Sequence, residues 1–132
     1  MKRASVCVLL NSEHGMLVMK RSPQSDWMPN KWGLVGGTVE PNETPQEAIL
    51  REIKEETNLK VDFIKLIYSR PYGGNEVFIY IGLVNDYKNI KINAEHIDYG
   101  WFNGKEIKLL DTVPELINII FKLTKCLILM VN

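Results

Sequence analysis

Residues 36–59, GGTVEPNETPQEAILREIKEETNL, join a Gly-Gly pair to six glutamates, three of which fall between residues 52 and 56. From Thr44 onward this stretch predicts one helix. Thr44 is a favoured N-cap, Pro45 suits the first helical position, and Glu47 completes a capping box with Thr44. Asn58 tolerates the left-handed backbone conformation that commonly ends a helix.

The predicted helix has a core face and an acidic face. The residues expected to face the core fall on one arc of the helical wheel: Ile49, Leu50, Ile53 and Thr57. Glu52, Glu55 and Glu56 project from the neighbouring side, where like charges repel by roughly a few tenths of a kcal/mol per pair. Convergent carboxylates are hard oxygen ligands suited to Mg²⁺ or Mn²⁺, and a bound ion would remove this repulsion. The alternative is an acidic face that only contacts water.

Length and composition restrict the classes of protein to which this chain can belong. The 132 residues, 45% of them hydrophobic and 24% charged, predict a single globular domain over residues 1–132. Sixteen basic residues balance sixteen acidic residues. This balance argues against a broad nucleic-acid-binding surface and against an anionic membrane as a partner.

Both cysteines, Cys7 and Cys126, lie in apolar runs far apart in the chain. We expect free buried thiols and a reducing compartment. The apolar runs near the two ends are too short for a signal sequence or a membrane span. A cytoplasmic protein without a membrane partner is therefore expected, and a homodimer is left open.

The remaining sequence predicts strands on both sides of the acidic helix and a second helix after them. Strand-like runs occupy residues 4–10, 15–21, 60–70, 75–84 and 99–103, residues 32–40 are a short glycine-rich segment, and residues 112–125 form an amphipathic helix. Residues 71–74, PYGG, are expected to be a turn between two of the strands. This order predicts an α/β domain with a mixed sheet between helices. The segment 126–132, CLILMVN, fits a final strand, a helix end or a partner-binding tail.

Residues 37–59 resemble the signature of the Nudix hydrolases, G-x5-E-x7-R-E-U-x-E-E-x-G-U, where U is a bulky aliphatic residue. Eight of the nine defined positions match: Gly37, Glu43, Arg51, Glu52, Ile53, Glu55, Glu56 and Leu59. The departure is Asn58, which stands where the signature has its second glycine. Apart from glycine, asparagine is the residue that best accepts the left-handed backbone conformation expected there. Just before the signature, the family's usual lead-in W-x-x-P-G-G appears as WGLVGG, so Val35 stands in place of the proline. The resemblance extends over residues 6–123.

The resemblance implies a Nudix α/β/α sandwich that hydrolyses a nucleoside diphosphate linked to another group. It implies Mg²⁺, with Mn²⁺ as an alternative, bound by a set of carboxylates and one backbone carbonyl: Glu52, Glu55, Glu56 and Gly36. Catalytic roles are implied for Glu52 and for Arg51, which would orient the glutamates. Glu43 would support the loop or a further ion.

Other roles implied by the resemblance lie outside the signature. A further catalytic glutamate is expected before a Trp-containing strand, and Glu95, six residues before Trp101, fits this place better than Glu76. Five residues are candidates for binding the substrate: Arg21 and Lys20 for phosphate, Gly37 for close backbone approach, Tyr72 for the base, and Trp27 as a residue that lines the pocket. His14 and His96 have no partner at metal-ligand spacing, so we expect both on the surface.

The substrate favoured by this compact chain is a (d)NTP, cleaved to a nucleoside monophosphate and pyrophosphate as in MutT-like enzymes. ADP-ribose, another nucleotide sugar or a dinucleoside polyphosphate is the alternative substrate. A Nudix module that binds nucleotides without turnover is the alternative of another class. The complete set of signature glutamates favours an enzyme.

Overall fold

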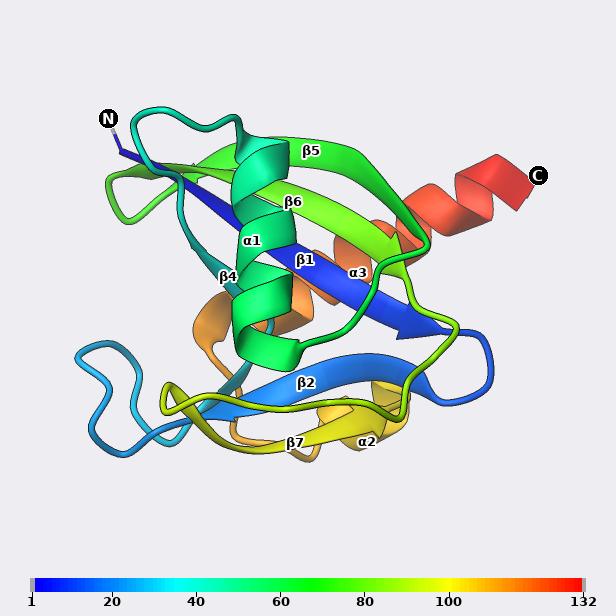
Figure 1. Cartoon of the computed structure of the whole chain (residues 1–132). Helices are drawn as coiled ribbons and strands as arrows, with labels where there is room; N and C mark the ends of the chain where they lie inside the picture. The colour runs from blue at the N-terminus through cyan, green and yellow to red at the C-terminus, as the bar shows by residue number, and fades with distance from the viewer. Residues whose placement is uncertain (1, 132) are drawn as a thin grey trace.

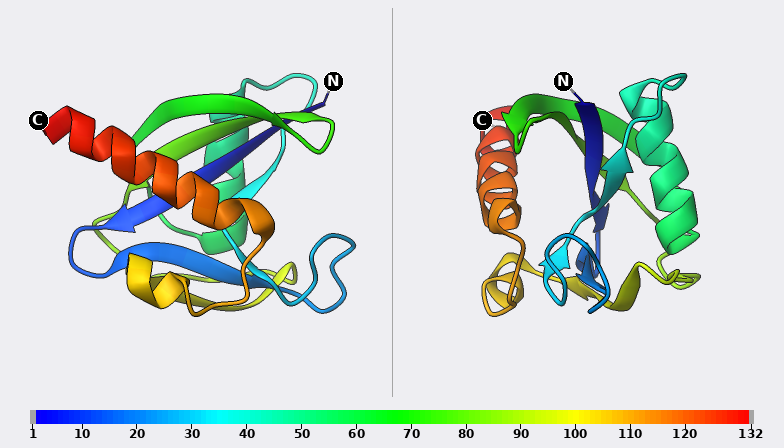
Figure 2. Two further views of the ribbon diagram at one scale, coloured as in Figure 1. Left: turned by 180° about the vertical axis from the view of Figure 1, so that it is seen from behind. Right: turned by 90° about the vertical axis from the view of Figure 1, so that its left-hand side faces the viewer.

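The structure is a computed structural model that describes the backbone of residues 2–131 and the side chains up to Leu123. A mixed seven-stranded sheet lies between α1 (Pro45–Thr57) on one face and α3 (Pro114–Val131) on the other (Figures 1 and 2). The predicted α/β/α sandwich is therefore confirmed. Among the described residues, no helix has the length and apolar character needed to cross a membrane.

Seven strands form the sheet. In chain order they are β1 (Lys2–Asn11), β2 (Gly15–Arg21), β3 (Trp32–Gly33), β4 (Val35–Thr38), β5 (Phe63–Tyr72), β6 (Asn75–Leu83) and β7 (His96–Phe102). The main path is β3-β2-β1-β6-β5, with β4 added to β1 and β7 added to β2. The β1–β6 pair is parallel and the other pairs are antiparallel.

The central strand β1 shares one of its edges between two neighbours. Its end pairs with β2 at Leu10 and Asn11, while its first half pairs with β4 from Ala4 to Cys7. The sheet therefore divides along this edge, and β2 continues into its own pairing with β7. A Cβ at Gly36 would collide with the backbone oxygen of Ser5, so glycine is what lets β4 approach β1.

Both predicted hairpins are present, with one correction to a turn. In the β5–β6 hairpin the turn is Gly73–Gly74 alone, with φ of +57° and +82°. These values suit the two-residue turns that match strand twist. Pro71 and Tyr72 are therefore the last residues of β5 and not part of the turn.

Three further segments differ from the sequence expectation or were left open by it. The glycine-rich segment forms two short strands, β3 and β4, because β3 pairs with β2 and β4 pairs with β1. Helix α2 (Gly104–Ile107) has four residues and is too short to produce a helical period. The C-terminal segment is the end of a helix, since α3 runs to Val131.

Helix α1 begins and packs largely as its sequence predicts. The capping box is formed, with the Thr44 hydroxyl accepting a hydrogen bond from the Glu47 amide and the Glu47 carboxylate accepting one from the Thr44 amide. Ile49 and Ile53 are buried against the sheet. Leu50, at the edge of the predicted arc, is 41% exposed, so its assignment to the core was wrong.

The first cysteine behaves as expected. Cys7 is a free thiol with no exposed surface, and burial raises its pKa well above the ordinary value. Its sulfur lies in the larger core, which α1 covers. The side chain of Cys126 lies outside the described residues, so the expectation for that thiol stays a prediction.

The end of α1 yields the first test. Asn58 has φ of 61° and ψ of 13°, the left-handed conformation, and its amide donates to the Lys54 carbonyl. Alanine pays a steric penalty in this conformation and glycine does not, so Asn58→Ala should lower the free energy of unfolding by about 1 kcal/mol. Urea unfolding with an unchanged m-value measures this.

The matched control is Asn58→Gly, which loses the same exposed side-chain contacts to Lys54 and Asn89. It should unfold within about 0.5 kcal/mol of the natural chain. Equal losses in the two variants would show that the side-chain contacts, and not the backbone conformation, decide the stability here.

Candidate active site

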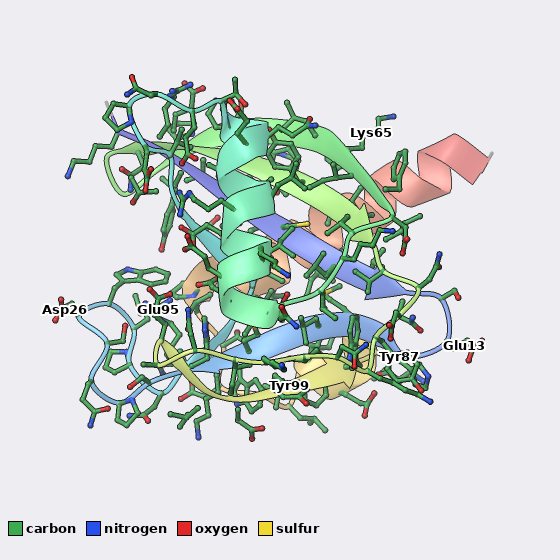
Figure 3. The ribbon with its side chains drawn as sticks, in the orientation of Figure 1. Glu13, Asp26, Lys65, Tyr87, Glu95 and Tyr99 are labelled. Atoms are coloured by element: carbon green, nitrogen blue, oxygen red, sulfur yellow. The ribbon has the colours of Figure 1, made fainter. Side chains whose placement is uncertain are left out.

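The acidic residues predicted to be functional gather at one end of the molecule. Figure 3 shows Glu95 beside the loop that carries Asp26, at the end opposite to Glu13 and Tyr87. The N-terminal loop of α1, the strand β4 and the loop before β7 all approach this end. Residues that are far apart in the chain therefore meet here.

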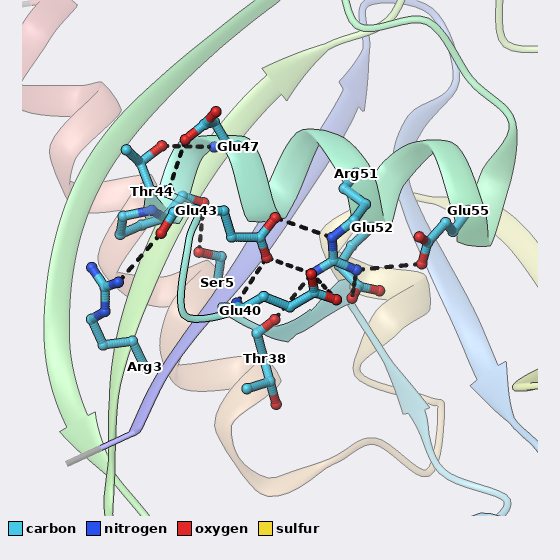
Figure 4. Close-up of polar contacts among 11 residues, drawn as sticks. Arg3, Ser5, Thr38, Glu40, Glu43, Thr44, Glu47, Arg51, Glu52 and Glu55 are labelled. Carbon is cyan, nitrogen blue, oxygen red and sulfur yellow. Dashed lines mark hydrogen bonds and ion pairs between the residues drawn. The ribbon is translucent and has the colours of Figure 1, made fainter.

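Arg51 binds three parts of the chain at once (Figure 4). Its Nε and Nη2 donate to the two carboxylate oxygens of Glu43, at 3.2 and 2.7 Å. Nη1 donates to Glu52 Oε1 at 2.7 Å and to Glu55 Oε2 at 3.4 Å. Nη2 also reaches the Thr38 carbonyl oxygen at 3.1 Å. One guanidinium thus joins α1 to the end of β4 and to the loop between them.

Electrostatics in this network follow from the shared cation. Hydrogen bonds from Arg51 hold the pKa of Glu43 below its usual value. In return, the hydrogen bond to Glu43 raises the pKa of Arg51. For Glu52 burial dominates and raises the pKa, although Arg51 opposes the shift. A bidentate guanidinium–carboxylate pair fixes orientation as well as charge, and a lysine cannot reproduce it.

Gly37 leaves room for the Glu52 carboxylate. A Cβ on Gly37 would stand 2.5 Å from Glu52 Oε1 and 2.6 Å from its carboxylate carbon. The carboxylate therefore lies directly over the backbone of β4. This contact explains the glycine physically: any side chain would displace the group that Arg51 holds.

Glu56 is a buried carboxyl group, only 2% exposed. Its Oε1 accepts a hydrogen bond from the Gly36 amide at 3.0 Å, and the group is also hydrogen-bonded to Glu95. Burial, together with the Glu95 hydrogen bond, raises the pKa of Glu56 to about 9. Two carboxyl groups this close share a proton unless a cation replaces it.

His96 is buried at the start of β7, with 5% of its surface exposed. The expectation that it lies on the surface was wrong, because its strand pairs with β2 and sets His96 opposite Arg21. Burial, together with the charge of Arg21, lowers its pKa. No spacing in the sequence revealed this position, since it depends on pairing between distant strands. His14 is exposed, as predicted.

A cleft of about 970 Å³ opens beside these groups. Most of the predicted site residues line it: Arg21, Trp27, Gly36, Gly37, Arg51, Glu52, Glu56, Tyr72 and Glu95. Apolar side chains of β6 and α3 line another part: Val77, Ile79, Leu116 and Ile119. The cleft thus combines an acidic wall with an apolar one.

Arg21 shapes the loop at the mouth of this cleft. Its Nε donates to the Trp27 carbonyl oxygen at 2.8 Å, and its Nη2 donates to Ser25 Oγ at 2.7 Å. The guanidinium carbon also lies 5.0 Å from the centre of the Trp27 ring. Arg21 and Trp27 therefore line the cleft as one stacked unit.

Four predicted or alternative residues do not line the cleft as the structure describes it. Lys20, Glu43, Glu55 and Glu76 are absent from its lining, whereas Glu95 is part of it. The Glu55 side chain is 54% exposed and contacts Arg51 from outside. The metal-binding role of Glu55 and the phosphate-binding role of Lys20 stay predictions.

Sequence reasoning missed one ion pair in the cleft. Arg70 Nη1 on β5 lies 2.9 Å from Glu115 Oε2 at the start of α3, and both residues line the cleft. Nothing in the local sequence connects two residues this far apart. The pair links the edge of the sheet to the helix on its second face.

The donor groups fit the divalent cation that the carboxylate pattern predicts. Glu52, Glu56 and Glu95 bring hard oxygen ligands to one wall of the cleft. Burial, together with the neighbouring Glu95, raises the pKa of Glu56 to about 9, so the ionised form of this carboxyl group is unfavourable without a nearby cation. A divalent ion would supply that charge and displace the shared proton.

The sequence profile of the NUDIX domain matches residues 1–123. The chain belongs to the Nudix family. Nucleoside triphosphatase NudI of Klebsiella pneumoniae (strain 342) is 31% identical, over 83% of this chain and 88% of that protein. The family and the enzyme class predicted from residues 37–59 are therefore confirmed, and the protein is a Nudix hydrolase.

Solved structures of the family have the same fold. A MutT protein from Methanosarcina mazei Go1 is 25% identical and superposes with a TM-score of 0.71, covering 92% of this chain and 90% of that one. The NUDIX domain of Shewanella oneidensis NrtR, complexed with ADP ribose, gives a TM-score of 0.80 at 18% identity, covering 94% and 86%. The NrtR likeness is one of fold alone.

Gly37 provides a test of how the acidic wall is held. In Gly37→Ala the new Cβ must push the Glu52 carboxylate aside, which a flexible side chain allows without unfolding. We expect affinity for Mg²⁺ to fall about tenfold or more, while the free energy of unfolding changes by less than about 1 kcal/mol. Calorimetric Mg²⁺ titration and urea unfolding measure the two quantities.

Gly104→Ala is the matched control, because a Cβ at Gly104 meets nothing within 4 Å. This variant should bind Mg²⁺ like the natural chain. Unchanged Mg²⁺ affinity in Gly37→Ala would mean that the position of the Glu52 carboxylate over Gly37 has no bearing on metal binding.

Proposed function

We propose that this Nudix hydrolase is a MutT-like pyrophosphohydrolase that cleaves a (d)NTP to a nucleoside monophosphate and pyrophosphate with Mg²⁺. The observation that carries the proposal is the cleft, in which an acidic wall of Glu52, Glu56 and Glu95 adjoins an apolar wall. A nucleotide has the same division between a charged phosphate chain and a flat base. The 31% identity to a protein named nucleoside triphosphatase NudI supports the same substrate class.

The size of the cleft also supports a nucleotide. Its volume of about 970 Å³ is at the upper end of the range for small-molecule sites. Trp27 and Tyr72 line it as aromatic residues that can stack on a base. Arg21, stacked on Trp27, brings a positive charge for phosphate close to one of these rings.

The residues proposed to hold the metal are those of the signature: Glu52, Glu55, Glu56 and the Gly36 carbonyl. A bound Mg²⁺ would neutralise phosphate charge and lower the pKa of a coordinated water. Arg51 keeps the Glu52 carboxylate in place from behind, and Glu43 keeps Arg51 in place. The Gly36 amide orients Glu56 through its hydrogen bond.

Glu95 is the residue proposed to take the proton from the attacking water. It is exposed, on a loop, and hydrogen-bonded to Glu56. A carboxylate in this position can accept a proton and release it to solvent. The loop itself is held at both sides, because the Ser22 amide donates to the Glu95 carbonyl oxygen and Asn93 donates to the Glu55 carbonyl oxygen. The cytoplasmic location and the homodimer stay predictions.

A hydrolysis screen tests the proposed substrate. Purified protein with Mg²⁺ is incubated with the common (d)NTPs, ADP-ribose, nucleotide sugars and dinucleoside polyphosphates, and the products are identified by chromatography. We expect the highest kcat/KM with a (d)NTP and the release of pyrophosphate. A higher kcat/KM for ADP-ribose or a dinucleoside polyphosphate would contradict the proposal, and so would release of single phosphates.

Glu95→Gln tests the role of the extra carboxylate. Glutamine keeps the shape but accepts no proton, so kcat should fall at least roughly tenfold with KM little changed, as expected when a transition-state interaction is lost. Steady-state kinetics with the best substrate measure both constants.

Glu76→Gln is the matched control, since Glu76 does not line the cleft. It should leave kcat nearly unchanged. The reverse result, with Glu76→Gln the more damaging variant, would assign the extra carboxylate to the β5–β6 hairpin.

A further inference from the structure

A second group of metal-binding side chains lies beside the signature glutamates. One ligand atom each from Glu56, Glu95 and His96 lies within 4.8 Å of the other two. Glu56 comes from α1, Glu95 from the loop before β7, and His96 from the first residue of β7. The Nudix signature contains only the first of these three residues.

His96 contributes a nitrogen that lacks a partner inside the protein. The residue is 5% exposed, and its Nδ1 is buried without a hydrogen-bond partner among the described residues. Buried imidazole nitrogens are almost always hydrogen-bonded or metal-bound. An unpartnered nitrogen beside two carboxyl groups is therefore a specific indication of a missing ligand.

The backbone holds this group in place before any ion binds. The His96 amide donates to the Asn93 carbonyl oxygen at 3.2 Å, and the Ser22 amide donates to the Glu95 carbonyl oxygen at 2.9 Å. His96 also pairs with Arg21, next to a β-bulge between Lys20 and Arg21. The side chains of Glu95 and His96 therefore project from a backbone segment that is anchored to β2.

We propose that His96 is a nitrogen ligand of a divalent transition-metal ion that Glu56 and Glu95 also bind. Mg²⁺ prefers oxygen ligands, whereas imidazole together with carboxylates suits ions such as Mn²⁺ and Co²⁺. The chain would then distinguish Mn²⁺ from Mg²⁺ through a residue outside the family signature. The inference depends on the donor geometry and not on the proposed substrate.

Pulsed electron paramagnetic resonance of bound Mn²⁺ detects a coordinated nitrogen directly and needs no substrate. We expect a ¹⁴N coupling in the natural chain, and a change to ¹⁵N coupling when the protein is produced with ¹⁵N-histidine. The sequence contains only two histidines, His14 and His96. His14 lies at the β1–β2 turn and stacks on Tyr87, at the opposite end of the molecule.

His14→Gln and His96→Gln form the matched pair of variants. The coupling should persist in His14→Gln, where His96 is the only histidine, and disappear in His96→Gln. Affinity for Mn²⁺, measured by calorimetry, should fall about tenfold or more in His96→Gln, with a smaller change for Mg²⁺. If His96→Gln fails to fold, His14→Gln with ¹⁵N-histidine still decides the assignment.

The absence of a nitrogen coupling in the natural chain would overturn the inference, as would a coupling that disappears in His14→Gln or persists in His96→Gln. Hydrolysis of nucleotides without nitrogen coupling would leave the proposed function intact and overturn only the role of His96. Nitrogen coupling without (d)NTP hydrolysis would support the role of His96 and overturn the proposed function.

Discussion

The arrangement of this end of the molecule depends on the Arg51 guanidinium. It binds Glu43 from the loop before α1, Glu52 from α1 itself, and the Thr38 carbonyl at the end of β4. Without this cation, the little-exposed carboxylates of Glu43 and Glu52 would both lose their compensating charge, which is strongly unfavourable. The same side chain that closes the loop thus decides where Glu52 points. One set of hydrogen bonds therefore both closes the loop and positions the Glu52 carboxylate.

The division of the sheet at β1 positions the segments that carry this network. Because β1 pairs with β4 at its start and with β2 at its end, β4 runs beneath α1. Gly36 allows the close approach to β1, and Gly37 leaves space for the Glu52 carboxylate. The Gly36 amide then binds Glu56. Two adjacent glycines therefore let the sheet carry an acidic wall that side chains would otherwise block.

The sequence predicted what depends on neighbours within one helix or one turn. The capping box at Thr44 and the left-handed Asn58 are set by local spacing, and the family signature overlaps the same stretch of chain. It did not predict what depends on pairing between distant segments. The burial of His96 follows from the β2–β7 register, and Arg21 is engaged by the loop of Trp27. No local pattern encodes either contact.

The central claim is that the planar, forked geometry of Arg51, and not its charge alone, holds the glutamates for catalysis. The direct test is kcat of Arg51→Lys with the best nucleotide substrate at saturating Mg²⁺. Lysine keeps the positive charge but cannot bind Glu43 and Glu52 together through a planar fork. The account predicts a fall in kcat of about tenfold to a hundredfold. A kcat close to that of the natural chain would contradict it and reduce Arg51 to an ordinary ion-pair partner.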